Sequence, residues 1–384
     1  MTLLGERKKL ALVTTTINVP VCLKEYARAY RESSYAGDLA VVVVADLKTP
    51  PEVGDYVRGL DWGKAEVHYL DVAAQAKLGH AFPLIDRLIP WNTIQRRNIG
   101  YLHAMQAGCD GIITIDDDNY NSSDDFFAHH ATVGCELRLP SMLGRDGWAN
   151  CCDVLESDRG PFVPRGWPAG EAGDAGTGEW GERTGRVAVN AGLWLGDPDI
   201  DAVTRLANPV DVSGFRAGVP RRFTSALGTW CPFNSQNTAF LAETLPAMYL
   251  FVMGAEYRGN KVGRYDDIWM SYVLRTVADH LGDLIVYGDP LVRQDRNEHD
   301  LLNDLSQELP GMILQRRFLE VLRGSTFTGA NYAECASELA AHLRSELVTS
   351  AQPGPEHNFW EGIVTGMEQW LELCSQIKSE SLIT

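Results

Sequence analysis

The stretch Gly111-Ile112-Ile113-Thr114-Ile115-Asp116-Asp117-Asp118-Asn119-Tyr120 decides the fold, because a short apolar run ends there in three consecutive carboxylates. Residues 112–115 are rich in β-branched side chains, which is typical of a buried strand. The aspartates therefore follow the carboxyl end of a strand, where open α/β sheets bind ligands. Because side chains alternate along a strand, we expect Asp116 and Asp118 to point the same way.

These three carboxylates indicate a cation site. Adjacent carboxylates repel one another and are costly at a buried strand end unless a positive charge lies there. A divalent cation with hard oxygen ligands meets this need, and Asp116 and Asp118 can share it with a diphosphate. The alternative is a solvated acidic loop, or an aspartate that caps a helix beginning near Asp124. The preceding strand favours the metal site.

Composition excludes several classes of protein. The chain of 384 residues is 45% hydrophobic and 22% charged, so it can bury a substantial core. Its formal net charge of −17 argues against a nucleic-acid partner, which needs clustered Lys and Arg. We see no apolar run of the ~20 residues that span a membrane, and no signal-peptide pattern. With 8 cysteines but no CxxC pair, we expect reduced thiols and a cytoplasmic location.

The N-terminal region predicts a parallel sheet. A strand, a helix and a second strand are expected at residues 10–16, 21–32 and 39–45. Thr16 and Asn18 follow the first strand, and Asp46 follows the second, so all three share an edge with the aspartates. They could hydrogen-bond a base or a ribose, although threonine is also a common strand residue and a lone aspartate often forms a turn.

Two arginines stand on the polar face of a helix expected at residues 89–107. Arg96 and Arg97 could neutralise a diphosphate, because guanidinium groups bind phosphate in a bidentate way. The alternative is an ordinary exposed helix face. Farther on, residues 169–186 are rich in Gly, Glu and Asp and predict a mobile loop that closes over a ligand, with order returning at residue 187.

A second pair of acids occurs in Gly263-Arg264-Tyr265-Asp266-Asp267-Ile268-Trp269, before an apolar helix expected at residues 270–281. The helix dipole alone can explain two acids at a helix N-terminus. Equally, one of them could act as a base or bind sugar hydroxyl groups. After residue 305 the pattern predicts amphipathic helices, including residues 333–347 and 360–377.

The sequence resembles the reversibly glycosylated polypeptides, a family that includes UDP-arabinopyranose mutases on a GT-A type nucleotide-sugar fold. The matching blocks, spread over roughly residues 10–320, are Thr16-Ile17-Asn18, Asp46, Arg97-Asn98-Ile99-Gly100-Tyr101, Ile113-Thr114-Ile115-Asp116-Asp117-Asp118, Arg165-Gly166-Trp167-Pro168, Gly192-Leu193-Trp194-Leu195, Asn237-Thr238-Ala239-Phe240 and the Gly263 to Trp269 stretch. The resemblance implies an α/β fold with a mixed, mostly parallel central sheet flanked by helices. We expect a catalytic domain at residues 1–305 and a helical C-terminal region at residues 306–384.

The resemblance also implies which residues bind the donor. Asp116, Asp117 and Asp118 would hold Mn²⁺ or Mg²⁺ and the diphosphate of a nucleotide-sugar, expected to be a UDP-sugar. Asp46 and Thr16 would hold the uridine. Further donor-binding residues are expected at Asn18, Arg96, Arg165 and Trp194.

Catalytic roles are expected at Arg97, Asp266 and Asp267. The resemblance places Arg97 at the position of the arginine that becomes reversibly glycosylated in the family. A fixed charge that balances the diphosphate is the other role open to Arg97. Asp266 and Asp267 would orient sugar hydroxyl groups or take an acceptor proton.

The chain departs from the family pattern near the metal. Asn119 replaces a cysteine, Asn18 replaces an arginine, and Gln294-Asp295-Arg296 stands where the family has His-Ser-Lys. Asp295 or His299 would then complete the metal site. The loop at residues 169–186 is also longer than in the family.

These departures favour a metal-dependent glycosyltransferase that acts on a small-molecule or carrier-bound acceptor, in a possible homo-oligomer. A UDP-sugar pyranose/furanose mutase is the first alternative. A non-catalytic nucleotide-sugar-binding subunit is the second.

Overall fold

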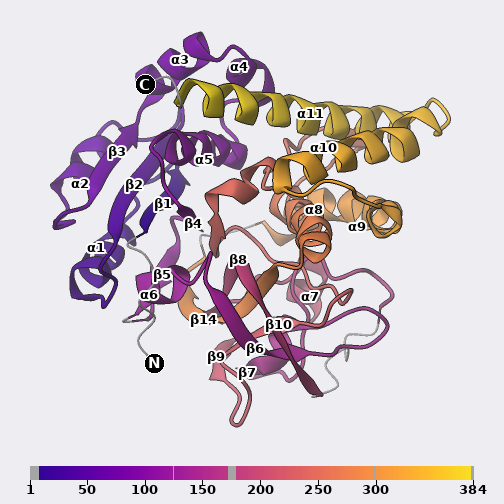
Figure 1. The fold of residues 1–384 in the computed structure, drawn as a ribbon, viewed down its shortest axis with the longest axis horizontal. Coiled ribbons are helices and arrows are strands. Elements are labelled where there is room, and N and C mark those ends of the chain that lie inside the picture. The colour runs from indigo at the N-terminus through magenta and orange to yellow at the C-terminus, as the bar shows by residue number, and fades with distance from the viewer. Residues whose placement is uncertain (1–7, 124, 172–178, 297–299, 382–384) are drawn as a thin grey trace.

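The central sheet organises the computed structural model, which describes residues 8–123, 125–171, 179–296 and 300–381. Within these residues a 12-stranded sheet runs in the order β3-β2-β1-β4-β11-β8-β6-β10-β14-β5, with β7 and β9 at its side. Figure 1 shows helices on both faces of this sheet. The predicted α/β class, with a mixed sheet flanked by helices, is confirmed.

The N-terminal part of the sheet is parallel. Its strands are β3 (Glu66–Leu70), β2 (Asp38–Ala45), β1 (Lys9–Thr16) and β4 (Gly111–Ile115). Both faces of β1, β2 and β4 are buried, because crossover helices cover each side, and this explains their nearly continuous apolar sequence. The carboxyl ends of the strands place Thr16, Asp46 and Asp116 along one edge, as the βαβ pattern predicts.

Beyond β4 the sheet becomes mixed. The strands are β11 (Asn237–Leu241), β8 (Trp180–Gly196), β6 (Glu136–Met142), β10 (Arg222–Ser225), β14 (Leu284–Gln294) and β5 (Asn119–Asn121), with β7 (Leu155–Ser157) and β9 (Val212–Phe215). β11 lies antiparallel to β4, with Asn237 opposite Ile115. The segments next to the aspartates therefore come from distant parts of the sequence.

β8 corrects the predicted loop at residues 169–186. The strand begins at Trp180, which pairs with Met142, and it runs antiparallel to β6 up to Arg186. Polar residues alternate with glycines in this stretch, and the exposed pair Arg138 and Glu182 crosses between the two strands. A partly exposed strand of this composition cannot be distinguished from a loop by its sequence pattern. Residues 172–178 lie outside the described residues, so the predicted closing loop stays a prediction.

The helix predicted at residues 89–107 is shorter. It begins as a 3₁₀ turn, η1 (Ile94–Arg96), and continues as α5 (Arg97–Gln106). α5 lies against the sheet so closely that a Cβ atom at Gly100 would come within 2.4 Å of Val13. Arg96 and Arg97 are fully buried, so the alternative of an ordinary exposed helix face is wrong. Because the helix packs closely on the sheet, these two side chains point inward and form hydrogen bonds with buried polar groups.

The C-terminal helices support the start of α8 (Asp266–Leu281). They are α9 (Leu301–Gly324), α10 (Tyr332–Leu343) and α11 (Pro355–Ser381), with a π-helical turn at Arg344–Thr349. Trp269 of α8 packs against Phe318 of α9 and Trp360 of α11, with ring centroids 5.3 Å apart in both pairs. The helical region begins at Leu301, so the predicted boundary at residue 305 falls inside α9. The division into two domains stays a prediction.

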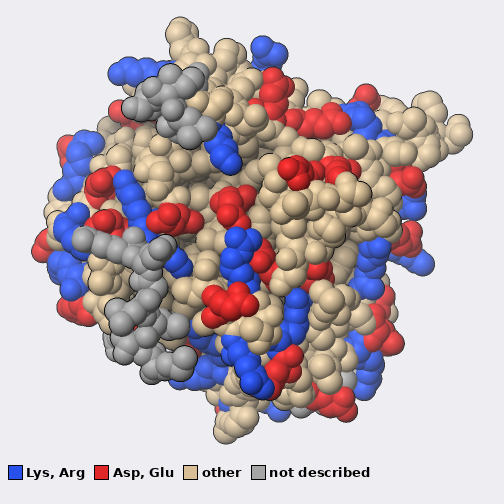
Figure 2. Space-filling view, viewed as in Figure 1, with Lys and Arg blue, Asp and Glu red and all other residues tan. Residues whose placement is uncertain are grey.

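The remaining elements connect these layers. They are α1 (Leu23–Glu32), α2 (Val53–Gly59), α3 (Val72–Ala81), α4 (Leu84–Leu88), α6 (Phe126–His130), η2 (Cys151–Val154), α7 (Ala202–Ala207), η3 (Ala242–Ala247), β12 (Glu256–Tyr257) and β13 (Asn260–Lys261). On the face in Figure 2, Lys and Arg side chains are interspersed with Asp and Glu. Within the described ranges, no helix has the length and apolar character needed to cross a membrane.

Candidate functional site

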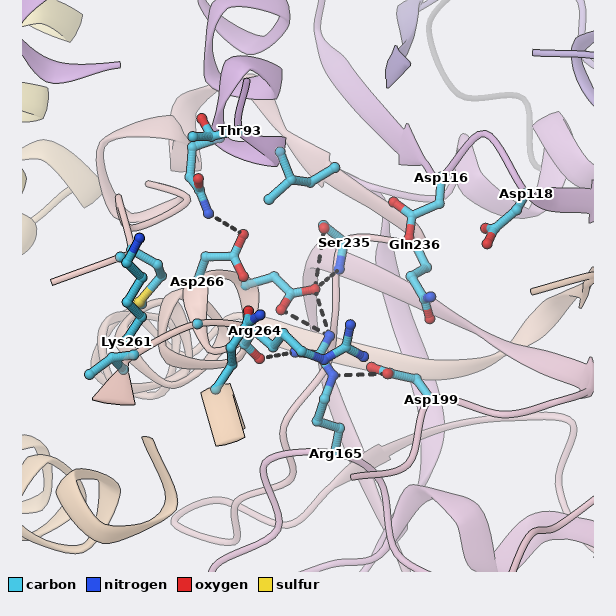
Figure 3. Close-up of a pocket in the computed structure, with 18 of the residues that line it drawn as sticks. Thr93, Asp116, Asp118, Arg165, Asp199, Ser235, Gln236, Lys261, Arg264 and Asp266 are labelled. Carbon is cyan, nitrogen blue, oxygen red and sulfur yellow. Dashed lines mark hydrogen bonds and ion pairs between the residues drawn. The ribbon is translucent and has the colours of Figure 1, made fainter. Parts of the chain in front are cut away.

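A cleft of about 460 Å³ opens where β4, β11 and the N-terminus of α8 meet. The predicted site residues that line it are Asp116, Asp118, Arg165, Asp266 and Asp267. Figure 3 shows Asp116 and Asp118 on one side of the cleft and Lys261 on the other, with Asp266 and Arg165 between them. The fold thus brings together the two acidic motifs that the sequence singles out.

The three aspartates after β4 divide between two directions. Asp116 and Asp118 line the cleft, whereas Asp117 accepts a hydrogen bond from the hydroxyl group of Thr16. Asp116 and Asp118 thus face the same way, as expected, although β4 ends at Ile115 and the turn at Asp117 and Asp118 sets these directions. Burial raises the pKa of Asp117, and the Thr16 hydrogen bond opposes that rise. Asn119, which follows, donates from Nδ2 to Asp118 Oδ1 at 3.0 Å and so orients the Asp118 carboxylate.

Arg97 provides a fixed positive charge behind Asp116. Its Nη2 donates to Asp116 Oδ1, and its Nη1 donates to Ser235 Oγ at 3.0 Å and to the Ser235 carbonyl at 3.1 Å. Burial alone would lower the pKa of Arg97, but Asp116 and Asp267 outweigh burial and raise it. Arg97 is therefore charged at any physiological pH. It lies behind the cleft wall rather than in the cleft.

Arg165 is the buried guanidinium that does line the cleft. Its Nε donates to Asp199 Oδ1 at 2.8 Å, and its Nη2 donates to Asp267 Oδ1 at 3.1 Å. Its Nη1 donates to the carbonyl of Arg264, whose φ of 59° is left-handed and uncommon outside glycine. Burial acts to raise the pKa of Asp199, but Arg165 outweighs it and lowers that pKa to about 2. The network holds Arg165 in one orientation.

The two acids at the start of α8 have different environments. Asp267 accepts from Arg165 and from the Ser235 backbone N–H at 3.0 Å, so its charge is compensated. Asp266 accepts from Gln95 Nε2 at 2.8 Å. Burial and the adjacent Asp267 raise the pKa of Asp266 to about 6. At neutral pH Asp266 can therefore take up and release a proton, which is the property of a general acid or base.

Several predicted donor-binding residues lie outside this cleft. Arg96 donates from Nε to Gln75 Oε1 at 3.0 Å and lies 3.5 Å from the centroid of the Trp91 ring. Burial lowers the pKa of Arg96 to about 10. Trp194 is buried within the sheet. None of these contacts turns Arg96 or Trp194 toward the cleft.

The residues predicted to hold the uridine lie at the neighbouring edge. Asp46 lines a separate cavity of about 370 Å³ with Thr49 and Asp71. Its carboxylate accepts from the backbone N–H groups of Asn92 at 2.8 Å and Thr93 at 3.2 Å, so it also fixes the segment before η1. Asn18 is exposed. Their role in binding a nucleoside stays a prediction.

The residues at the strand end fit a hard divalent cation held jointly with its ligand. In the part of the chain that the structure describes, no group of three or more His, Cys, Asp or Glu residues is arranged to hold a metal ion. Mg²⁺ is commonly bound by one or two carboxylates together with phosphate oxygens of the substrate. Asp116 and Asp118 supply such a pair. Asp295 is exposed, with its backbone N–H 3.1 Å from the Asp118 carbonyl, and His299 lies outside the described residues.

Sequence reasoning missed Gln95, Asp199, Ser235 and Gln236, which all line the cleft. Ser235 and Gln236 directly precede the Asn237 block, so its position offered a signal. Gln95 sits beside the two arginines that were considered, but nothing local shows that it reaches Asp266. Asp199 is recognisable only from its ion pair with Arg165.

Comparison with known proteins identifies the family. A sequence profile described as "Reversibly glycosylated polypeptide" matches residues 180–379, more than half of the chain. The chain belongs to the reversibly glycosylated polypeptide family. Its mixed sheet with flanking helices is the α/β arrangement that the resemblance implies. The matched segment contains Asp266 and Asp267, whereas Asp116, Asp118 and Arg165 precede it.

Named relatives of this family member are mutases. UDP-arabinopyranose mutase 3 of Arabidopsis thaliana is 30% identical over 194 residues, which is 50% of this chain and 51% of the relative. Probable UDP-arabinopyranose mutase 1 of Solanum tuberosum is 32% identical over 190 residues, or 49% of this chain and 50% of the relative. The alignments thus span about half the length of the curated relatives.

Solved structures with a related chain arrangement are more distant. Glucosyl-3-phosphoglycerate synthase from Mycobacterium tuberculosis, in complex with Mn²⁺, UDP and phosphoglyceric acid, aligns with a TM-score of 0.39 and 14% identity. The alignment covers 80% of this chain and 78% of that one. S. aureus TarS with UDP-GlcNAc aligns with a TM-score of 0.36 and 11% identity, over 93% of this chain and 70% of that one. At this level of similarity the structures add nothing to the argument about the site.

Proposed function

We propose that the protein is a metal-dependent UDP-sugar mutase that interconverts the pyranose and furanose forms of a sugar on its nucleotide. The observation that carries this proposal is the family match over residues 180–379, which includes the Asp266 side of the cleft. The named relatives are UDP-arabinopyranose mutases. These findings support the mutase better than the glycosyltransferase that the sequence analysis placed first.

The strand-end side of the cleft suits the diphosphate. Asp116 and Asp118 would hold Mn²⁺ or Mg²⁺, which would neutralise negative charge on the departing diphosphate. Arg97 keeps Asp116 in place through its ion pair and adds a positive charge that does not depend on pH. Because these groups are oriented before the substrate binds, they can stabilise charge that develops during bond cleavage.

The helix-start side of the cleft suits the sugar. In the proposed reaction the anomeric C–O bond to the diphosphate breaks, and the electron pair stays on the phosphate oxygen. A second sugar hydroxyl loses a proton and attacks the anomeric carbon, the original ring oxygen leaves and gains a proton, and the diphosphate then returns. One proton therefore moves between two sugar oxygens. Asp266, with its pKa near 6, is suited to carry it, while Arg165 and Asp267 hold the surroundings rigid.

The test is incubation of the pure protein with Mn²⁺ and a panel of UDP-pentoses and UDP-hexoses. The mutase predicts an isomeric UDP-sugar, separated by chromatography and identified by NMR, with no free UDP. Free UDP that accumulates with an acceptor would instead show transfer. Binding without conversion would show a non-catalytic subunit.

Glycosyl transfer to a small-molecule or carrier-bound acceptor is the second candidate, because Gln294, Asp295 and Arg296 replace the family's His-Ser-Lys beside Asp118. A covalent sugar on Arg97 would displace its contacts with Asp116 and Ser235. In this arrangement Arg97 therefore acts as a fixed charge rather than as a sugar acceptor. A cytoplasmic location and a homo-oligomer stay predictions.

A further inference from the structure

Gln95 joins two parts of the cleft that are far apart in the sequence. It lies in η1, and its Nε2 donates to Asp266 Oδ2 at the start of α8, at 2.8 Å. Both side chains are buried and both line the cleft. Among the described residues, Gln95 is the side chain that hydrogen-bonds this carboxyl group. The bond therefore acts on the acid that we propose carries the sugar proton.

The segment that carries Gln95 is anchored on each side. Before it, the backbone N–H of Thr93 donates to Asp46 Oδ2 at 3.2 Å. After it, Arg96 is held by Gln75 and by the face of Trp91. Because these contacts fix the turn, the Gln95 amide is directed at Asp266 before any ligand binds. A side chain held in this way can set the orientation of its partner.

The charged groups that act on Asp266 are Asp267 on the same helix and Arg165, and Arg264 and Lys261 also line the cleft. Arg165 is shared between Asp199 and Asp267, and Arg264 is bound by Glu308 of α9 at 2.7 Å. Neither guanidinium makes an ion pair with Asp266 within the described part of the chain. The neutral amide of Gln95 is thus the side chain that hydrogen-bonds Asp266, beside the Asp266 backbone N–H.

We propose that Gln95 is a positioning residue for Asp266. Its amide occupies Oδ2 of the carboxylate, which leaves Oδ1 as the oxygen that takes and returns the sugar proton. This role rests on the proposed function and extends it to a residue outside the matched family segment. A hydrogen-bond donor favours the ionised carboxylate, so Gln95 adds to Arg165 and the Asp266 backbone N–H in opposing the rise that burial and Asp267 impose on the pKa of Asp266.

The decisive measurement is the pH dependence of kcat/KM for Gln95→Leu with a UDP-sugar and saturating Mn²⁺. Loss of the donor should raise the apparent pKa of Asp266 in this pH profile by about one unit. Gln307→Leu is the matched control, because Gln307 is another glutamine of the cleft but has no hydrogen bond to Asp266 in the described structure. In Gln307→Leu the apparent pKa of Asp266 should stay unchanged. Reduced activity in Gln95→Leu with an unchanged apparent pKa would show a merely structural role and overturn the proposal.

A second readout needs no turnover. The carboxyl band of Asp266 is followed through a pH titration by infrared difference spectroscopy, with Asp266→Asn as the reference. The band should titrate about one unit higher in Gln95→Leu than in wild type. If the protein converts no UDP-sugar but this shift occurs, the proposed function fails and the Gln95 inference stands. If the titration does not move, the inference fails whatever the activity. Gln95→Met, of similar length and without the donor, replaces Gln95→Leu if the latter unfolds.

Discussion

The two ends of the cleft use the same residue type in different ways. At the strand end, Asp116 and Asp118 are partly exposed, and the charge of Asp116 is balanced by Arg97. At the start of α8, Asp266 and Asp267 are both buried, and of these two acids only Asp267 forms an ion pair with Arg165 in the described structure. The first pair is open to a cation, whereas burial and Asp267 raise the pKa of Asp266 so that it can hold a proton. Burial and one arginine, rather than the aspartate itself, decide which chemistry each end supports.

The largest expected effect concerns the strand end. Asp118→Asn should lower turnover by about a hundredfold or more, because a neutral amide binds a divalent cation poorly and the diphosphate charge is then left without the cation that neutralises it. EDTA should have the same effect on wild type, and Mn²⁺ or Mg²⁺ should reverse it. Asp117→Asn is the matched control, since Asp117 bonds to Thr16 rather than lining the cleft. Full activity in EDTA would contradict the proposed dependence on a metal ion.

Substitution of each of the two acids at the start of α8 should have a different effect. Asp266→Asn should lower turnover by about a hundredfold and leave UDP binding intact, because it removes the proton carrier. Asp267→Asn should mainly lower the free energy of unfolding, by about 2 kcal/mol, because buried Arg165 loses a charged partner. Kinetics, UDP titration and chemical unfolding of both variants provide the measurement. Equal losses of turnover and stability in the two variants would show that the pair acts as one unit.

The difference between the two ends also marks what sequence alone can predict. β1, β2 and β4 were predictable, because runs of β-branched residues are a local property of the sequence. The pairing of Arg165 with Asp199, and of Gln95 with Asp266, was not predictable. These contacts depend on how η1, β11 and α8 pack, which no local pattern encodes. For the same reason the burial of Arg96 and Arg97 was not predictable.

The pH dependence of stability tests the proton held by Asp266. Its pKa is about 6 in the folded protein, against about 4 in an unfolded chain. The folded state therefore binds more protons between these values, and this contribution to stability is lost as pH rises from about 4 to about 6. Relative to Asp266→Asn, wild type should lose about 2–3 kcal/mol across that range, measured by urea unfolding. Parallel curves of unfolding free energy against pH for the two proteins would contradict a raised pKa of Asp266.

The smallest expected effect concerns Arg97, whose role differs from that of Arg165 by position. Arg97 is enclosed by Asp116 and Ser235 behind the cleft, so its charge should matter more than its reactivity. Arg97→Lys keeps the charge but loses the planar fork of donors, so turnover should fall about tenfold without being abolished. No sugar mass should remain on wild type after donor treatment, as measured by intact-protein mass spectrometry. An added pentose or hexose on wild type that is absent from Arg97→Lys would instead show that Arg97 leaves its enclosed position during the reaction and accepts the sugar. That result would assign the covalent step to Arg97 and make its burial a feature of the resting enzyme.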